Sequence, residues 1–179
     1  MLGPQHRPNV GSIDRPTVDQ GGVVPTIRIT RESCLQPDRV LTAARDFTAR
    51  RCEIFPAVQP SYFELHSTGE HSADVTEGTR LGPMFNWERC DYDWSKPDSV
   101  LADVTDSNVY DPNGSWWRLT ATPAAAGSRV EMVWERNFKR TPKGRLMNLV
   151  FKRAGRRLFS SYAREILENL ERLETHSDT

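Results

Sequence analysis

Hydrophobic and polar residues follow two different periods along the chain. In Thr26–Thr30 they alternate, as in a strand with one buried face. Between residues 61 and 138 the chain is rich in Val, Thr, Trp, Phe and Tyr and is interrupted by turn-forming residues. This texture predicts six more strands: Tyr62–Thr68, Ser72–Thr76, Phe85–Trp94, Ser99–Asp106, Ser115–Thr122 and Arg129–Phe138. The short connections favour sequential hairpins, and therefore an antiparallel sheet.

Two turn signals between these strands are of particular interest. Asn113-Gly114 is the strongest of all, because this pair favours tight turns with positive φ. Glu77-Gly78 is expected to end the strand that begins at Ser72.

Helical spacing appears in two parts of the chain. Pro37 is suited to a first helical turn, and apolar residues after it predict two short helices between Pro37 and Phe55. After Pro142, apolar residues recur in steps of three and four, which predicts a helix of about eight turns. Its apolar stripe consists of Met147, Phe151, Ala154, Leu158, Tyr162, Ile166, Leu170 and Leu173. The sheet is the available partner for this stripe, so the fold class is α+β.

The domain boundaries follow from where these periods begin and end. Residues 1–22 contain no apolar period and are expected to form a disordered tail. The folded domain is expected to span residues 23–174, and residues 175–179 to form a disordered C-terminal end.

Composition indicates which partners and which cellular compartment to expect for the protein. The 179 residues contain 24 Lys+Arg and 24 Asp+Glu, so the formal net charge is zero and nucleic-acid binding is not indicated. No apolar stretch is long enough for a membrane span, and the N-terminus lacks the apolar core of a signal peptide. Cys34, Cys52 and Cys90 form no motif and are expected to be buried free thiols. We therefore expect a cytoplasmic protein without stable membrane insertion, and its Arg-rich composition indicates a bacterial source.

Several short phrases occur in the order expected of a known superfamily: Arg50-Arg51, Tyr62–Leu65, Ala73–Thr79, Tyr92–Trp94, Val104–Asn108 and Gly127–Glu131. With them, the chain from Val24 to Leu173 resembles the START-related SRPBCC superfamily, especially its bacterial polyketide cyclase/dehydrase and lipid-transport-like members. The resemblance implies a helix-grip fold. In that fold a seven-stranded curved antiparallel sheet wraps around a long C-terminal helix, two short helices follow the first strand, and a ligand cavity lies between sheet and helix. The resemblance implies no single activity.

Side-chain alternation predicts which residues would line such a cavity. On the strands these are Val100, Ala102, Val104, Trp117, Leu119, Ala121, Met132 and Trp134, with Trp87 from an earlier strand. On the long helix they are Met147, Phe151, Ala154 and Leu158. The pattern alone favours a filled core made of the same side chains, whereas the resemblance favours a ligand cavity.

Arg136 is the polar residue of most interest, because it shares the apolar face of Trp134. A buried guanidinium needs a partner, and Asp91, Asp93 or a ligand carboxylate or enolate could supply it. Alternatively, Arg136 extends into water from the end of its strand. If the protein is an enzyme, the candidate catalytic residues are Arg136, Asp91 and Tyr92. Two inward phases are open for Phe85–Trp94, and a β-bulge would reconcile them.

Basic residues cluster in two places on the long helix. Those at its start, Lys139, Arg140, Lys143 and Arg145, oppose the helix dipole, which would make sense if anions visit that end. A later set, which lies opposite the apolar stripe, is interpreted as a solvated face: Arg153, Arg156, Arg157 and Arg164.

Recognisable cofactor and catalytic motifs are missing from the sequence, which contains no GxGxxG, P-loop, HExxH or GxSxG. His66 and His71 flank the Gly69 turn and could approach one another, but a metal site there would need further ligands. We therefore expect no metal and no cofactor.

These features are compatible with three functional hypotheses. The first is a module that binds a small hydrophobic molecule (polyketide-like, aromatic or lipid) in the cavity. The second is a cyclase or dehydratase of poly-β-keto substrates that uses the same cavity. The third is a non-catalytic interaction domain with a filled core. Each is compatible with a monomer or a homodimer.

Overall fold

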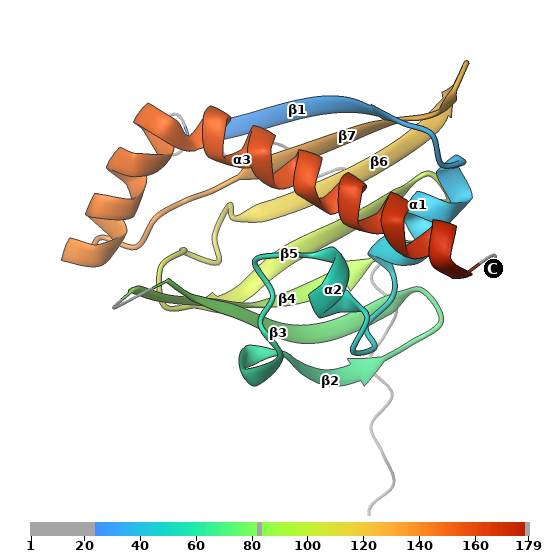
Figure 1. The fold of residues 1–179 in the computed structure, drawn as a ribbon. Coiled ribbons are helices and arrows are strands. Elements are labelled where there is room, and N and C mark those ends of the chain that lie inside the picture. Colours follow the sequence, from blue (N-terminus) through green and yellow to red (C-terminus); the bar gives the residue numbers. More distant parts are fainter. Residues whose placement is uncertain (1–23, 82–83, 178–179) are drawn as a thin grey trace, which may run out of the picture.

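The computed structural model describes residues 24–81 and 84–177, which form one antiparallel sheet and the helices packed on it (Figure 1). The seven strands lie in the order β1-β7-β6-β5-β4-β3-β2. Their bounds are β1 Thr26–Ser33, β2 Glu64–Thr68, β3 Ser72–Leu81, β4 Met84–Asp93, β5 Ser99–Ser107, β6 Trp116–Ala124 and β7 Gly127–Glu135. The helices are α1 Pro37–Ala44, α2 Arg51–Ile54, the 3-10 turn η1 Pro60–Tyr62 and α3 Pro142–Ser177. This arrangement confirms the predicted α+β helix-grip fold.

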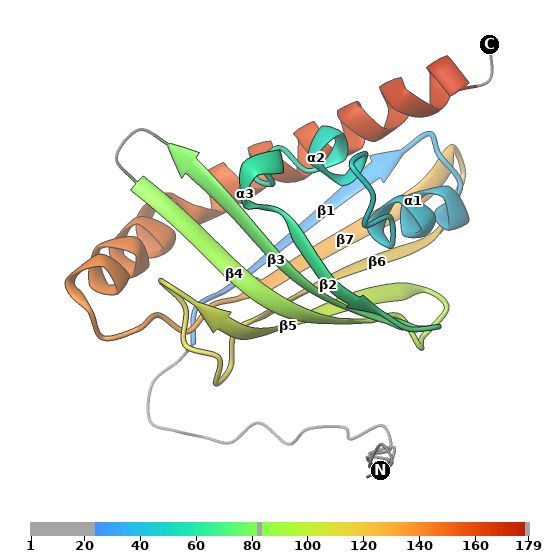
Figure 2. The same cartoon turned by 90° about the horizontal axis from the view of Figure 1, so that it is seen from below.

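The sheet curves around α3, which crosses it obliquely (Figures 1 and 2). Close approach to β1 depends on Gly155, where a Cβ atom would lie 2.6 Å from Ile27 Cδ1. The second half of the helix buries Ile166 and Leu170, while α1 packs against β5, β6 and β7. The sheet and its helices thus enclose one core, as the period change after Pro142 predicts.

The prediction of a turn at Glu77-Gly78 is wrong. β3 continues to Leu81, and Glu77 pairs with Glu88 across the ladder to β4. The inward alternation that begins at Ala73 simply continues, so that Glu77 occupies a buried position. Gly78 fits there because a Cβ atom would lie 3.1 Å from the Cβ atoms of Tyr62 and Trp87. Gly114, by contrast, has φ 86°, as the predicted Asn113-Gly114 turn requires.

The second half of β4 has a clear inward phase. Cys90 and Tyr92 are buried, whereas Asp91 and Asp93 are exposed. The pairing of β4 with β5 shifts between Arg89 and Cys90. The extra residue at this bulge belongs to β5, whereas we predicted a bulge in β4.

Other boundaries differ from those expected by a few residues. β7 ends at Glu135, three residues before the predicted end, and Phe138 forms only an isolated bridge to Tyr110. α3 runs to Ser177 and so includes part of the expected C-terminal end. The expected N-terminal tail, residues 1–22, lies outside the described residues. The cysteines are free, but Cys34 is exposed, contrary to expectation.

Candidate ligand-binding site

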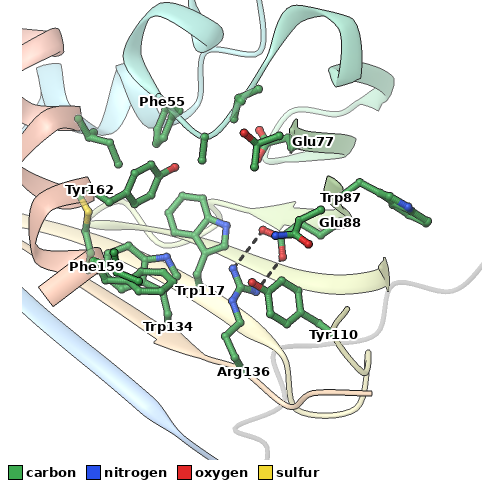
Figure 3. A pocket seen from close by; sticks show the side chains of 18 of the residues that line it. Phe55, Glu77, Trp87, Glu88, Tyr110, Trp117, Trp134, Arg136, Phe159 and Tyr162 are labelled. Carbon is green, nitrogen blue, oxygen red and sulfur yellow. Dashed lines mark hydrogen bonds and ion pairs between the residues drawn. The ribbon is translucent and has the colours of Figure 1, made fainter. Parts of the chain in front are cut away.

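A cavity of about 340 Å³ lies between β3, β4 and the middle of α3 (Figure 3). Its apolar part is formed mainly by Phe55, Val58, Trp117, Met132, Trp134, Phe159 and Ile166. Its polar part is formed by Arg51, Glu77, Thr79, Asn86, Glu88, Tyr110, Arg136 and Tyr162. Leu158 also lines the cavity while 53% exposed, which places it at the opening. Ligand sites commonly combine a largely apolar wall with a few placed polar groups.

Two carboxylates stand side by side at the polar end. Glu77 and Glu88 are direct cross-strand partners in the β3–β4 ladder, and both line the cavity. Like charges directly opposite each other destabilise a sheet, and burial adds a desolvation penalty. Each carboxylate is accordingly paired with an arginine from a different element.

Arg51, from the start of α2, neutralises Glu77. The guanidinium is fully buried, and its Nε donates to Glu77 Oε1. Its Nη1 donates to the carbonyl of Ala44 at 3.1 Å, and its Nη2 donates to the Tyr92 hydroxyl at 2.8 Å. The Tyr92 hydroxyl in turn donates to Glu77 Oε2 at 2.9 Å. Every nitrogen of Arg51 is therefore satisfied within the protein, which is the pattern of a structural ion pair.

The guanidinium of Arg136 is only partly satisfied. It is 3% exposed, and its Nη2 donates to Glu88 Oε1 at 3.1 Å. Its Nη1 lies 3.0 Å from Glu88 Oε2 without hydrogen-bond geometry, and neither Nη1 nor Nε has a hydrogen-bond partner among the described residues. The Tyr110 ring lies 4.5 Å from the guanidinium carbon (Figure 3). Asn86 Oδ1 also lacks a partner in the described part of the chain. Unsatisfied buried donors and acceptors are costly in a core and useful in a binding site.

Burial raises the pKa of two groups in the cavity. The pKa of Glu88 is raised, because desolvation and the neighbouring Glu77 outweigh the attraction of Arg136. The pKa of Tyr162 is also raised, chiefly by burial, so its hydroxyl stays protonated and able to donate at neutral pH. Figure 3 shows this hydroxyl directed away from α3 and into the cavity. The polar end thus offers a cation, a carboxyl group of raised pKa and a phenolic donor.

Comparison with known proteins gives matches at the level of structure. Neither a family model nor a curated protein matches the sequence. The protein TTHA0849 of Thermus thermophilus has a TM-score of 0.68 at 13% identity, over 83% of this chain and 99% of that one. The Zhui aromatase/cyclase of Streptomyces sp. R1128 has a TM-score of 0.66 at 12% identity, over 83% and 94% of the two chains. A START superfamily protein of Mycobacterium smegmatis has a TM-score of 0.63 at 12% identity, over 83% and 98%. The protein has the START-like fold. The expected resemblance is confirmed for the fold, and at these identities the comparison extends no further.

Some of the residues predicted to line a ligand cavity do line this one. The predicted residues that line it are Trp87, Trp117, Met132, Trp134, Arg136 and Leu158. Trp87 does so with its indole directed away from Glu88 and Arg136 (Figure 3). The other predicted residues lie elsewhere in the fold: Val100, Ala102, Val104, Leu119, Ala121, Met147, Phe151 and Ala154. Those on β5 and β6 are buried in the core, and Phe151 packs against Phe138 and Phe159.

The three catalytic candidates fall in different places. Arg136 lines the cavity, but its partner is Glu88, so the predicted pairing with Asp91 or Asp93 is wrong. Asp91 lies on the exposed face of β4 and points away from the cavity. Tyr92 is buried beneath the polar end, where its hydroxyl is occupied by Arg51 and Glu77.

Several cavity residues were missed from the sequence: Arg51, Phe55, Glu77, Glu88, Tyr110, Phe159 and Tyr162. A usable signal existed for the carboxylates. Glu77 continues the alternation of Ala73 and Val75, and Glu88 that of Cys90 and Tyr92, so each is a charge at an inward position. For Arg51 no comparable periodic signal exists, because it opens a helix of only four residues.

Two further expectations concern metal and membrane. Within residues 24–81 and 84–177, no cluster of three or more His, Cys, Asp or Glu side chains is arranged to hold a metal ion. His66 instead hydrogen-bonds to Thr76 Oγ1 at 2.7 Å, and His71 lies 3.7 Å from Glu70. In the same part of the chain, no helix has the length and apolar character needed to cross a bilayer.

Proposed function

We propose that the protein binds a small, mainly apolar molecule in the cavity and holds a polar group of that molecule at Arg136. The observation that carries this proposal is the contrast between the two arginines. Each nitrogen of Arg51 donates a hydrogen bond within the protein, whereas two nitrogens of Arg136, Nε and Nη1, have no hydrogen-bond partner among the described residues, at the end of a largely apolar cavity. A buried donor of this kind is well suited to a ligand keto, phenolate or carboxylate oxygen.

Size and lining restrict the ligand further. A cavity of about 150 Å³ holds benzene, so 340 Å³ accommodates roughly two to three ring-sized groups. Trp117 and Trp134 supply flat aromatic surface, and the Tyr162 hydroxyl can donate a second hydrogen bond. A polyketide-like or aromatic compound with spaced oxygen atoms fits this combination better than a saturated acyl chain. Along its length, a saturated chain has no oxygen atoms to accept hydrogen bonds from Arg136 and Tyr162.

Filling the cavity is expected to weaken binding without unfolding the protein. Thr79 lies on the inward face of β3 and lines the cavity, so Thr79→Trp places an indole in the space that the ligand would occupy. We expect anilinonaphthalene sulfonate, an aromatic probe with an anionic group, to bind wild type saturably and Thr79→Trp at least about tenfold more weakly. Fluorescence titration measures both affinities.

Thr76→Trp is the matched control, since it adds the same indole to the outward face of the same strand. Its affinity for the probe should equal that of wild type. Equal affinity of all three proteins, or no saturable binding by wild type, would show that the cavity is not the ligand site.

An enzymatic use of the same cavity is a second proposal, and the raised pKa of Glu88 is the observation that favours it. A carboxyl group of raised pKa beside a cation can act as an acid or base at an enolisable ketone. Similarity of fold to an aromatase/cyclase supports a trial with poly-β-keto thioesters. Glu88→Gln should then lower turnover about a hundredfold while probe binding persists. Absence of turnover by wild type would leave the binding proposal intact and remove the enzymatic one.

A further inference from the structure

The start of α3 presents an exposed apolar surface that the cavity does not use. Among the described residues, six large apolar side chains are exposed, and four of them lie on this helix: Leu146, Leu149, Val150 and Leu158. The fraction exposed reaches 54% at Leu146. Leu146, Leu149 and Val150 are spaced by three and four residues, so they share one helix face. The opposite face carries Phe151, which is buried.

Charge is segregated around this surface. Residues 139–158 contain eight basic residues and no acidic one, in a chain whose formal net charge is zero. They are Lys139, Arg140, Lys143, Arg145, Lys152, Arg153, Arg156 and Arg157. Lys139 pairs with Asp106, and Lys143 donates to the carbonyl of Phe85. The other six make no ion pair with a described residue, so their charge remains available to a partner.

The positive charge destabilises the start of the helix. Positive residues near a helix N-terminus oppose its dipole, and the first turn of α3 contains no acidic residue to offset them. Figures 1 and 2 show these first turns at one end of the molecule, at an angle to the rest of α3 and outside the layer that it forms with the sheet. The contact of Lys143 with Phe85 places them beside the start of β4.

We propose that the first turns of α3, residues 142–158, dock the protein on an anionic membrane surface. A basic helix with an aliphatic face lies in the bilayer interface, where the apolar side chains enter the acyl boundary and the basic side chains contact anionic headgroups. A second copy of the same face is disfavoured by like charge. Protein hot spots are enriched in Trp and Tyr, whereas the exposed apolar residues here are aliphatic. An anionic lipid surface therefore matches both the charge and the side-chain chemistry.

The docking face and the cavity opening lie on different sides of α3. Leu158 lines the cavity opening and follows Phe151 by two helical turns, so it lies on the helix face opposite Leu146 and Leu149. Membrane docking does not depend on what the cavity binds, and the two are tested separately.

Flotation of the full chain with lipid vesicles tests the proposal. Vesicles of phosphatidylcholine with about 30% phosphatidylglycerol should carry the protein to the top of the gradient, because each basic residue near an anionic surface adds to binding. Vesicles of phosphatidylcholine alone should not. Raising the salt concentration should release the protein, since screening weakens contact between exposed charges.

Paired variants separate docking from nonspecific charge. Arg153→Gln/Arg156→Gln/Arg157→Gln should weaken binding about a hundredfold. The control Arg28→Gln/Arg39→Gln/Arg129→Gln changes the net charge equally on other surfaces and should bind like wild type. Leu146→Asn/Leu149→Asn should weaken binding at least about tenfold, and Leu65→Asn, an exposed leucine on β2, should not.

Three results would overturn the proposal. They are equal binding of wild type to neutral and anionic vesicles, equal loss in the two triple-arginine variants, and no binding to either kind of vesicle. In the last case, capture of the same basic face by DNA or polyglutamate would identify a soluble polyanion as its partner. Probe titration in the absence of vesicles reports on the cavity throughout, so failure of one proposal is distinguishable from failure of the other.

Discussion

Replacement of Glu77 by leucine is expected to lower the free energy of unfolding by about 3–5 kcal/mol. The reason is the environment of Arg51, which is fully buried and packed between the rings of Phe47 and Phe55. Without Glu77, its guanidinium loses the only anion in its ion pair and cannot reach water. Urea denaturation followed by tryptophan fluorescence measures the change.

Two controls define what the loss means. Glu131→Leu removes the partner of Arg28, an exposed pair, and should cost less than about 1 kcal/mol. The double variant Arg51→Met/Glu77→Leu removes both charges and should recover much of the stability lost by Glu77→Leu, because no uncompensated charge remains. A loss at Glu77 no greater than that at Glu131 would refute the assignment of a buried structural pair.

The fold could be predicted because its signals are local. The alternation in Thr26–Thr30 and the switch to helical spacing after Pro142 each reflect a side-chain period that a single element imposes on its own residues. The Asn113-Gly114 turn is equally local, since it depends on the backbone conformations that Gly114 tolerates.

The polar end of the cavity could not be predicted in the same way, because it is assembled by pairing between distant elements. Arg51 and Glu77 are separated by 26 positions, and Glu88 and Arg136 by 48. Glu77-Gly78 has the composition of a turn, and only the register with β4 shows that it lies within a strand. Arg136 was identifiable as a charge on an apolar face, but its partner depends on that register as well.

The predicted apolar lining shows a different limit. Alternation correctly identifies the inward face of β5 and β6, as the burial of Val100 and Leu119 shows. It does not tell which part of that face is covered by α1 and which part faces a cavity. The same limit applies to α3, where Leu158 follows the apolar period of the helix yet reaches solvent at the cavity opening.

Replacement of Arg136 by methionine is expected to produce a pH-dependent loss of stability. Glu88 would remain in the cavity without its cation, so its pKa in the folded protein, already raised by burial, would rise further. A carboxyl group whose folded pKa exceeds its unfolded pKa takes up a proton on folding. The contribution of Glu88 to the stability of the variant is therefore fully present below the ordinary glutamate pKa of 4.5 and is lost as pH rises through the folded value.

We expect the deficit of Arg136→Met relative to wild type to be small near pH 5 and to reach about 3 kcal/mol at pH 8. Urea denaturation across this range measures it, and each tenfold change in the proton affinity of Glu88 corresponds to about 1.4 kcal/mol. The double variant Arg136→Met/Glu88→Gln lacks the titrating group, so its deficit should not vary with pH. If the free energy of unfolding of wild type and Arg136→Met varied with pH in parallel, Glu88 would not be paired with Arg136. The position from which this arginine is proposed to contact a ligand would then be wrong.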